Sequence, residues 1–207
     1  MSDLVVTATE EHHQTAEGLH FVGGELLVLV ARAHLTEYWG CNDEDGEYSD
    51  DSHYEEICAA EGLHCEVAGN PVLSLQTPDS TAFLPTETGG YLLRWIGADS
   101  AAGVLSVALQ QPYQALGERT WTVPEGGVVL FAGTADGREM EPLVAQALAD
   151  GKSHLPKGEP FLHIALPSGA YEIDQLEGRE FRGKVRHPSG ELESLMVQSF
   201  RLRRAGE

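Results

Sequence analysis

Residues 89–109 read GGYLLRWIGADSAAGVLSVAL, and this stretch decides the fold. After its Gly-Gly pair, the apolar run from Tyr91 to Ile96 has the length and composition of a β-strand. Asp99 or Ser100 can cap a following helix, because a short polar side chain accepts a hydrogen bond from a first-turn N–H group. The apolar face of that helix consists of Ala101, Val104, Leu105 and Ala108. The stretch therefore predicts a strand followed by a helix.

The same order of a Gly-Gly pair, an apolar strand and a helical segment occurs twice more, in residues 23–40 and 126–151. In the later copy we expect Pro142 in the first turn of the helix, because proline lacks the N–H group that a first turn leaves unpaired. Gly151 is expected to end that helix, since glycine readily adopts the left-handed backbone of a helix end. The three occurrences are either an internal duplication or a coincidence, because strand-then-helix units are common.

Ser52 and Glu55 have the spacing of a capping box and predict a further helix that ends before Gly62. Turn signals between apolar runs predict short strands elsewhere. These strands are expected at 64–67, 72–76, 82–84, 161–166, 171–173, 180–185 and 195–202. Because short turns separate the last four, the C-terminal part should be mainly antiparallel sheet. The predicted fold class is α+β, with mixed or antiparallel sheets and about four short helices.

The chain has 207 residues, of which 42% are hydrophobic, so it can bury a core without disulfides or metals. Residues 1–20 are polar and are expected to form a loosely ordered tail. An acidic α+β half is expected at 21–115 and a β-rich half at 116–207. The two halves are either separate domains or one continuous domain.

Thirty-three acidic and thirteen basic residues give a formal net charge of −20 at pH 7. This charge repels the phosphates of nucleic acids and of anionic membranes, so we expect neither as a partner. The excess is concentrated, because residues 1–103 contain nineteen acidic residues and only Arg32 and Arg94 as basic ones. Such concentration indicates a surface directed at a basic partner.

The sequence shows no signal-peptide pattern and no apolar run that approaches the roughly 18 residues of a membrane span, so the cytoplasm is the expected location. Cys41, Cys58 and Cys65 are odd in number and contain no C-x-x-C pair, which indicates reduced, mostly buried thiols. His53 and His64 lie in the same region, so a zinc site is the alternative if the fold gathers these side chains. We expect no cofactor and no metal.

Residues 42–56 are the most acidic segment, since eight of the fifteen are Asp or Glu and none is Lys or Arg. One interpretation is a solvated loop whose last carboxylates favour the positive end of the next helix. Another is a calcium loop, but aligning Gly46 with the EF-hand glycine places Cys41 at the first ligand position and Ser52 where a bidentate Glu is required. The third is a protein-binding face.

The protein-binding interpretation combines long-range attraction by carboxylates with aromatic side chains that can anchor a contact. Its candidate contact residues are Trp39, Asp43, Glu44, Asp45, Glu47, Tyr48, Asp50, Asp51 and Tyr54. A partner with a nucleic-acid-binding groove of Lys and Arg would suit this surface, because carboxylates can occupy the places of its phosphates.

The sequence signals for catalysis are weaker than those for protein binding. Gly151-Lys152-Ser153 resembles the end of a P-loop, but Ala147 stands where the first glycine must let the backbone cradle a phosphate. The patterns G-x-G-x-x-G, G-x-S-x-G and H-E-x-x-H do not occur. We therefore expect that the protein is not an enzyme and has no catalytic residues.

Short motifs between Phe21 and Arg203 occur in the order of a known family. They are Gly23-Gly24-Glu25-Leu26-Leu27-Val28-Leu29, Trp39-Gly40-Cys41, Asp51 with Tyr54 and Cys58, Phe83-Leu84-Pro85, Leu93-Arg94-Trp95, Ala98-Asp99-Ser100 and Leu166-Pro167-Ser168-Gly169-Ala170-Tyr171. In these motifs the chain resembles the immunity protein 21 family of bacterial polymorphic toxin systems. The resemblance implies a stoichiometric inhibitor that binds and neutralises a cognate toxin in the cytoplasm.

Charge and resemblance together predict an immunity-type protein whose acidic surface meets a basic site on a toxin. The alternatives are a metal-dependent enzyme, suggested by the Cys and His residues, and an acidic scaffold protein that binds other basic partners. The sequence does not indicate an oligomeric state.

Overall fold

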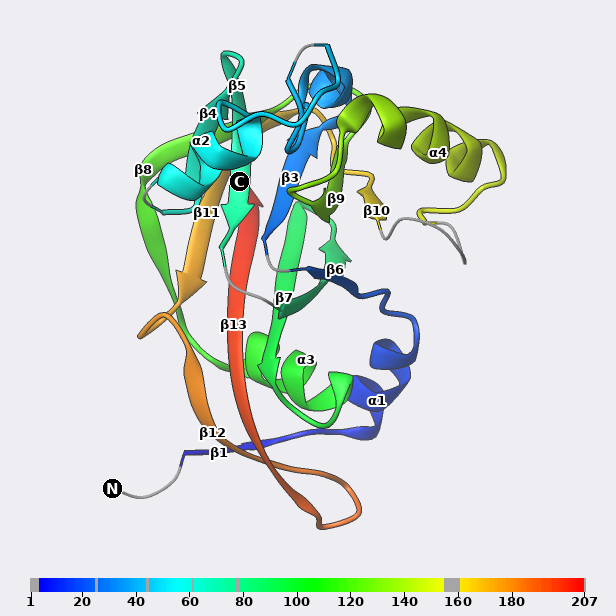
Figure 1. Cartoon of the computed structure of the whole chain (residues 1–207). Coiled ribbons are helices and arrows are strands. Elements are labelled where there is room, and N and C mark those ends of the chain that lie inside the picture. The colour runs from blue at the N-terminus through cyan, green and yellow to red at the C-terminus, as the bar shows by residue number, and fades with distance from the viewer. Residues whose placement is uncertain are drawn as a thin grey trace. The chain divides into compact units, whose positions relative to one another are not determined.

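The computed structural model describes residues 4–24, 26–43, 45–60, 62–76, 79–154 and 161–206 (Figure 1). These residues form four α-helices, one 3-10 helix and thirteen strands. Strands account for 44% of the described residues, and the C-terminal part is mainly strand. The α+β fold class is confirmed.

The chain packs into two compact units, and each takes segments from both halves of the sequence. The first unit lies within Met1–Phe21, Asp79–Trp121 and Ala170–Glu207, and the second within Val22–Pro78 and Thr122–Gly169. The division into an acidic half at 21–115 and a β-rich half at 116–207 stays a prediction. The two compact units show which segments pack together, and they do not test whether either half folds by itself.

The first unit is built on a long central strand, β13 (Leu192–Arg204), which pairs with three other strands in antiparallel fashion. Its partners are β7 (Gly89–Gly97), β11 (Gly169–Leu176) and β12 (Phe181–Arg186). The sheet continues with β6 (Asp79–Thr86), β8 (Tyr113–Val123) and β1 (Val5–Thr7). β1 pairs with β12 in parallel, which brings the start of the chain onto the sheet.

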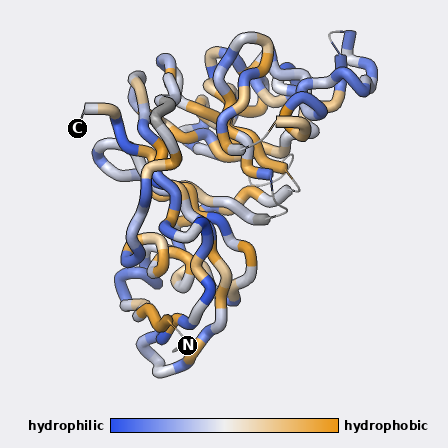
Figure 2. Tube along the Cα trace, turned by 90° about the vertical axis from the view of Figure 1, so that its left-hand side faces the viewer, coloured by the Kyte–Doolittle hydropathy of each residue, from blue (hydrophilic) through white to orange (hydrophobic). Residues whose placement is uncertain are grey.

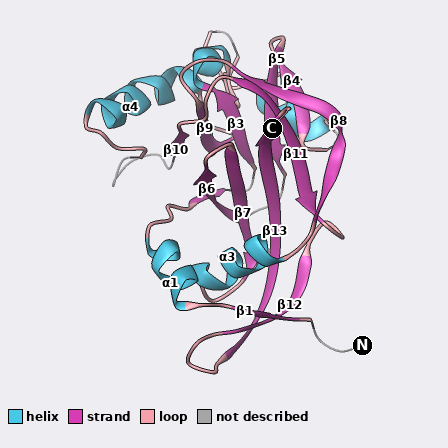
Figure 3. Cartoon of the chain, turned by 180° about the vertical axis from the view of Figure 1, so that it is seen from behind, coloured by secondary structure: helices cyan, strands magenta, loops and turns pink. Residues whose placement is uncertain are grey.

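Helix α3 (Ala101–Gln110) packs on β7, β12 and β13 and lies beside α1 (Glu10–Glu17), as Figure 3 shows. The Ser100 hydroxyl accepts a hydrogen bond from the Gly103 N–H group at 3.0 Å, so Ser100 is the N-cap of the two candidates, Asp99 and Ser100. Helix and strands bury a common core that includes Leu93, Val104 and Val197.

The expected loose tail at 1–20 is wrong for the described residues, which form β1 and α1. Val6 and Ala8 are buried in the first unit's core and fix the strand. Thr9 then caps α1 in a capping box with His12. The polar composition of residues 1–20 did not indicate this structure, because the buried apolar side chains of only two residues, Val6 and Ala8, anchor the strand.

The second unit contains an antiparallel sheet in the order β10-β9-β3-β5-β4. These strands are Phe161–Ile164, Val128–Ala132, Leu27–Ala31, Asn70–Leu75 and His64–Val67, and β2 (Val22–Gly24) contacts β9. The 3-10 helix η1 (Arg32–Glu37), α2 (His53–Ala59) and α4 (Gly137–Ala149) complete the unit. Figure 2 shows the Cα trace of the chain coloured by hydropathy, with the hydrophobic stretches in orange.

Two helix predictions for this unit need correction. The segment after β3 is a 3-10 helix and not an α-helix. Helix α4 begins at Gly137, so Pro142 lies in its second turn. The earlier start has a clear cause, since the Asp136 carboxylate caps the helix by accepting from the Arg138 N–H group at 2.8 Å.

Gly40 is expected to be far less tolerant of alanine than Gly62, although both have a left-handed backbone, with φ of +62° and +95°. A Cβ atom at Gly40 would lie 2.5 Å from the Thr134 carbonyl oxygen, whereas nothing lies within 4 Å at Gly62. Gly62→Ala should cost about 1 kcal/mol from the backbone alone, and Gly40→Ala about 2–5 kcal/mol because the clash adds to it. Urea unfolding measures both, and equal costs would contradict this geometry.

Candidate protein-binding surface

Of the predicted contact residues that the structure describes, Tyr54 lies in the first turn of α2 and the others lie on the loop that joins η1 to α2 in the second unit. The acidic segment folds back on itself through an antiparallel bridge between Asn42 and Tyr48. The Asp43 N–H group donates to the Glu47 carbonyl oxygen at 2.7 Å, and the Asp43 carboxylate accepts from the Asp45 and Glu47 N–H groups at 3.0 Å each. Asp43 is thus a turn-forming residue, and the segment has a defined shape.

Trp39 forms the aromatic base of the loop. Its ring stacks on the buried His53 ring at 4.4 Å and an interplanar angle of 19°. The backbone N–H group of Trp39 also donates to His53 Nδ1 at 3.1 Å, and this hydrogen bond requires that Nδ1 carries no proton. Burial lowers the pKa of His53, with nearby Arg138 acting in the same direction and Glu56 and Asp136 opposing it. The neutral imidazole therefore holds Trp39 in place.

Arg138 connects this base to the start of α4. Its guanidinium donates to the Asp136 carboxylate, with Nη2 to Oδ2 at 2.6 Å, and Nη2 also donates to the Asp43 carbonyl oxygen at 3.2 Å. Its guanidinium carbon lies 5.9 Å from the Trp39 ring centroid, within cation–π range. Burial disfavours a charged Asp136, but its hydrogen bonds to Arg138 outweigh this and keep the pKa of Asp136 low. Arg138, held by the buried Asp136 carboxylate, thus fixes the loop to the helix.

The outward side of the loop carries the charge. Tyr48 is 72% exposed, and Asp45, Glu47, Asp50 and Asp51 are exposed as well. Trp39 is half-buried, and Tyr54 is half-buried against the core. Tyr48 is therefore the best presented of the three predicted aromatic contacts. Glu44, also predicted, lies outside the described residues.

The helix signal at the end of the loop is confirmed. The Ser52 hydroxyl accepts from the Glu55 N–H group at 3.4 Å, and α2 ends at Ala59, before Gly62. Glu55 and Glu56 lie in its first turn, where carboxylates favour the positive helix end. Glu55 and Glu56 therefore fit the solvated-loop interpretation, and the binding interpretation of the other carboxylates stays a prediction.

The metal interpretations gain no support from the described residues, in which no group of three or more His, Cys, Asp or Glu side chains is arranged to hold an ion. Cys58, expected in the core, is exposed, and Cys41 and Cys65 are partly exposed. The reason is geometric, because α2 buries His53 and Ile57, and Cys58 follows Ile57 off that face.

The second unit also carries most of the net charge. It contains eighteen Asp and Glu and four Lys and Arg, a formal charge of −14, whereas the first unit has fifteen and nine, a charge of −6. The exposed carboxylates of the loop thus lie in the more acidic unit.

Comparison with known proteins identifies the family. Residues 20–179 match the family described as immunity protein 21, which covers most of both units. The chain belongs to the immunity protein 21 family. No curated protein and no solved structure matches the chain. Every predicted contact residue from Trp39 to Tyr54 lies within the part that matches the family, and the resemblance drawn from the short motifs is confirmed.

The sequence did not reveal that Asp136 and Arg138 hold the acidic loop in place. Asp136 precedes Gly137 and could have been recognised as a helix cap. Arg138, its ion-pair partner, donates to the Asp43 carbonyl oxygen ninety-five positions earlier in the chain, and no local pattern reveals a contact at that separation. In the described residues, no helix has the length and hydrophobicity needed to cross a membrane.

Proposed function

We propose that this protein binds and neutralises a cognate toxin in the cytoplasm, and that the loop from Trp39 to Tyr54 meets a basic surface on that toxin. Membership of an immunity protein family supports the role. The observation that carries the choice of surface is the loop itself, in which exposed carboxylates and Tyr48 project from a base fixed by Trp39, His53 and Arg138.

The charge of the loop serves the first stage of binding. Exposed carboxylates attract a basic partner over about 10 Å at 0.1 M salt and raise the association rate more than the final affinity. A toxin that acts on nucleic acid has a groove of Lys and Arg, and the carboxylates would fill it in place of phosphates. Inhibition of this kind needs no catalytic residue.

Tyr48 serves the second stage. An exposed tyrosine offers a large apolar area and a hydroxyl group at a low cost in side-chain entropy, which is why tyrosine is frequent among residues that dominate binding energy. Its backbone bridge to Asn42 orders the chain beneath it before the partner arrives. Such preorganisation reduces the entropy lost on binding.

Copurification tests the proposal. The product of the neighbouring gene, carrying the only affinity tag, should retain this protein in a one-to-one complex that survives gel filtration. A neighbouring product that shows no binding, or binding far from equal stoichiometry, would count against a stoichiometric inhibitor.

A further inference from the structure

The base of the acidic loop contains a buried histidine whose contacts depend on its protonation. His53 begins α2, and only 5% of it is exposed. Its ring stacks on the Trp39 ring at 4.4 Å between centroids, and its Nδ1 atom accepts a hydrogen bond from the Trp39 backbone N–H group at 3.1 Å. Because a backbone N–H group can only donate, this bond exists only while Nδ1 carries no proton. A proton added to His53 must therefore change its contact with Trp39.

The backbone on either side of Trp39 is held by groups that do not titrate. The Tyr38 carbonyl oxygen accepts a hydrogen bond from the Gly137 N–H group at 2.8 Å. The Gly40 carbonyl oxygen accepts one from the Tyr54 N–H group at 2.9 Å. Both bonds join backbone atoms, so a change of pH does not alter their donors or acceptors. Protonation of the imidazole thus acts on Trp39 and leaves its neighbours in the chain in place.

The surroundings of His53 favour the neutral ring. Burial lowers the pKa of His53 most strongly, and the Arg138 guanidinium acts in the same direction. The carboxylates of Glu56, on the same helix, and of Asp136, at the start of α4, oppose this lowering and do not offset it. The Tyr38 ring lies 5.8 Å away and is uncharged, because burial raises the pKa of Tyr38 well above its ordinary value. The pKa of His53 therefore lies below its ordinary value of 6.5.

A charged imidazole has no arrangement that keeps both contacts with Trp39. If the ring stays in place, the new Nδ1 proton points at the Trp39 N–H group, and two donors face each other without an acceptor. If the ring turns to avoid this, it leaves the stack, whose interplanar angle is 19°, and with it the attraction between a cation and an indole face. Trp39 loses at least one of its two contacts in either case.

We infer that His53 is a pH-sensitive switch that holds Trp39 in the base of the acidic loop when neutral and releases it when protonated. Release of Trp39 loosens the base from which the exposed carboxylates and Tyr48 project. A looser base costs more entropy to order on binding, so the partner is bound less tightly at acidic pH. The effect on the toxin rests on the proposed function, whereas the release of Trp39 belongs to the free protein.

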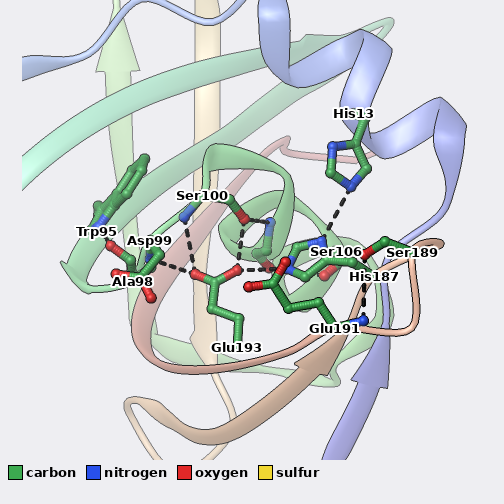
Figure 4. Close-up of polar contacts among 11 residues, drawn as sticks. His13, Trp95, Ala98, Asp99, Ser100, Ser106, His187, Ser189, Glu191 and Glu193 are labelled. Carbon is green, nitrogen blue, oxygen red and sulfur yellow. Dashed lines mark hydrogen bonds and ion pairs between the residues drawn. The ribbon is translucent and has the colours of Figure 1, made fainter.

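Burial alone does not make a histidine act in this way, as His187 shows (Figure 4). His187 lies in the turn that joins β12 to β13, and its Nε2 atom lies 2.7 Å from the Glu193 carboxylate. Burial disfavours the charge of Glu193, but hydrogen bonds from Ser100, Asp99 and His187 outweigh burial and keep the pKa of Glu193 low. An ionised carboxylate accepts from a neutral or a charged imidazole, so this contact survives protonation. The partner of His53 is instead a donor.

The first test follows the full chain by NMR from about pH 8 to about pH 5, the range in which histidine titrates. The ring signals of His53 should titrate with a midpoint below 6.5, and the backbone N–H signal of Trp39 should shift with the same midpoint. A Trp39 signal that keeps its position while His53 takes up its proton would overturn the inference. So would a His53 ring that stays neutral down to about pH 5.

Two variants assign the titration to one residue. In His53→Asn the side-chain oxygen can take the place of Nδ1 and accept from the Trp39 N–H group without titrating, so the pH dependence of the Trp39 signal should disappear. His163→Asn removes another partly buried imidazole of the second unit, which contacts the Gly126 carbonyl oxygen at 2.8 Å, and should leave that dependence unchanged. A dependence that persists in His53→Asn would contradict the switch. Should this variant fail to fold, the titration of the unmodified chain decides alone.

The second test joins the switch to the toxin. One pH unit below the midpoint found by NMR, about one molecule in ten keeps a neutral His53. The affinity of the unmodified protein for the neighbouring gene's product should therefore fall about threefold to tenfold more than that of His53→Asn. An equal fall in both proteins would contradict a role of Trp39 release in toxin binding. A neighbouring product that binds neither protein at any pH would refute the proposed partner, and the NMR titration would still decide the switch.

Discussion

Replacement of Glu193 by alanine is expected to reduce the free energy of unfolding by about 3–5 kcal/mol, the loss typical of removing one partner from a buried charged network. The Glu193 carboxylate joins β13 to the start of α3 and to His187. Its removal leaves buried N–H donors of Asp99 and His187 without a partner. Urea unfolding followed by tryptophan fluorescence measures the loss.

The neighbouring Glu191 provides the control. Its side chain is exposed on the same turn, so Glu191→Ala should change the free energy of unfolding by no more than about 0.5 kcal/mol. A loss of less than 1 kcal/mol in Glu193→Ala would show that the carboxylate is dispensable to the fold.

The lowered pKa of Glu193 should make the stability of the protein depend on pH. The pKa of Glu193 in the folded protein lies below its ordinary value of 4.5, so its contribution to stability is complete above pH 4.5 and is lost as the pH falls through the folded value. Glu193→Ala lacks this contribution at every pH. The difference in unfolding free energy between the two proteins should therefore be largest near pH 7 and shrink below pH 4.5. A difference that stays constant would contradict an ionised Glu193.

Neutralising the acidic loop is expected to slow association with the toxin by about 10-fold to 100-fold at low salt. The variant Asp45→Asn, Glu47→Gln, Asp50→Asn removes three exposed charges and spares Asp43, whose carboxylate shapes the turn. The effect should fade as salt is raised, because salt screens exposed charges. Stopped-flow mixing measures the rate, and urea unfolding should show unchanged stability.

Three other exposed carboxylates of the same unit provide a control with an equal change in charge. The variant Glu66→Gln, Glu125→Gln, Asp150→Asn leaves the loop intact and should slow association far less. Equal slowing by the loop variant and the control would assign the effect to net charge and not to the loop.

Tyr48→Ala should act instead on the dissociation rate, because a contact residue contributes more to the bound state than to the encounter.

Local signals in the sequence were enough for much of the fold. Ser52 was recognised as a helix cap, and Ser100 as one of two candidates, because capping depends on residues three positions apart. The antiparallel C-terminal part followed from turns between apolar runs. The predicted start of α4 was wrong because it relied on Pro142, which is compatible with the first turn of a helix. The residue that caps the helix is Asp136, and its short polar side chain was the stronger signal.

The rest depends on contacts between distant positions. α1 has no fully buried residue, so its sequence has no apolar face that would distinguish it from a tail. Glu193 meets Ser100 across ninety-three positions, and Arg138 meets the acidic loop across ninety-five. The acidic loop itself was recognisable from composition, but the shape that holds its charges outward was not, because Trp39, His53 and Arg138 are brought together only by the fold.

Growth during co-expression tests the central claim most directly. The neighbouring gene is induced alone, with this protein, with the variant Asp45→Asn, Glu47→Gln, Asp50→Asn, or with the variant Glu66→Gln, Glu125→Gln, Asp150→Asn. We expect growth arrest from the neighbour alone, full rescue by the unmodified protein and by the second variant, and weaker rescue by the loop variant at matched protein levels. Arrest that this protein does not relieve, or equal rescue by both variants, would contradict neutralisation through the acidic loop.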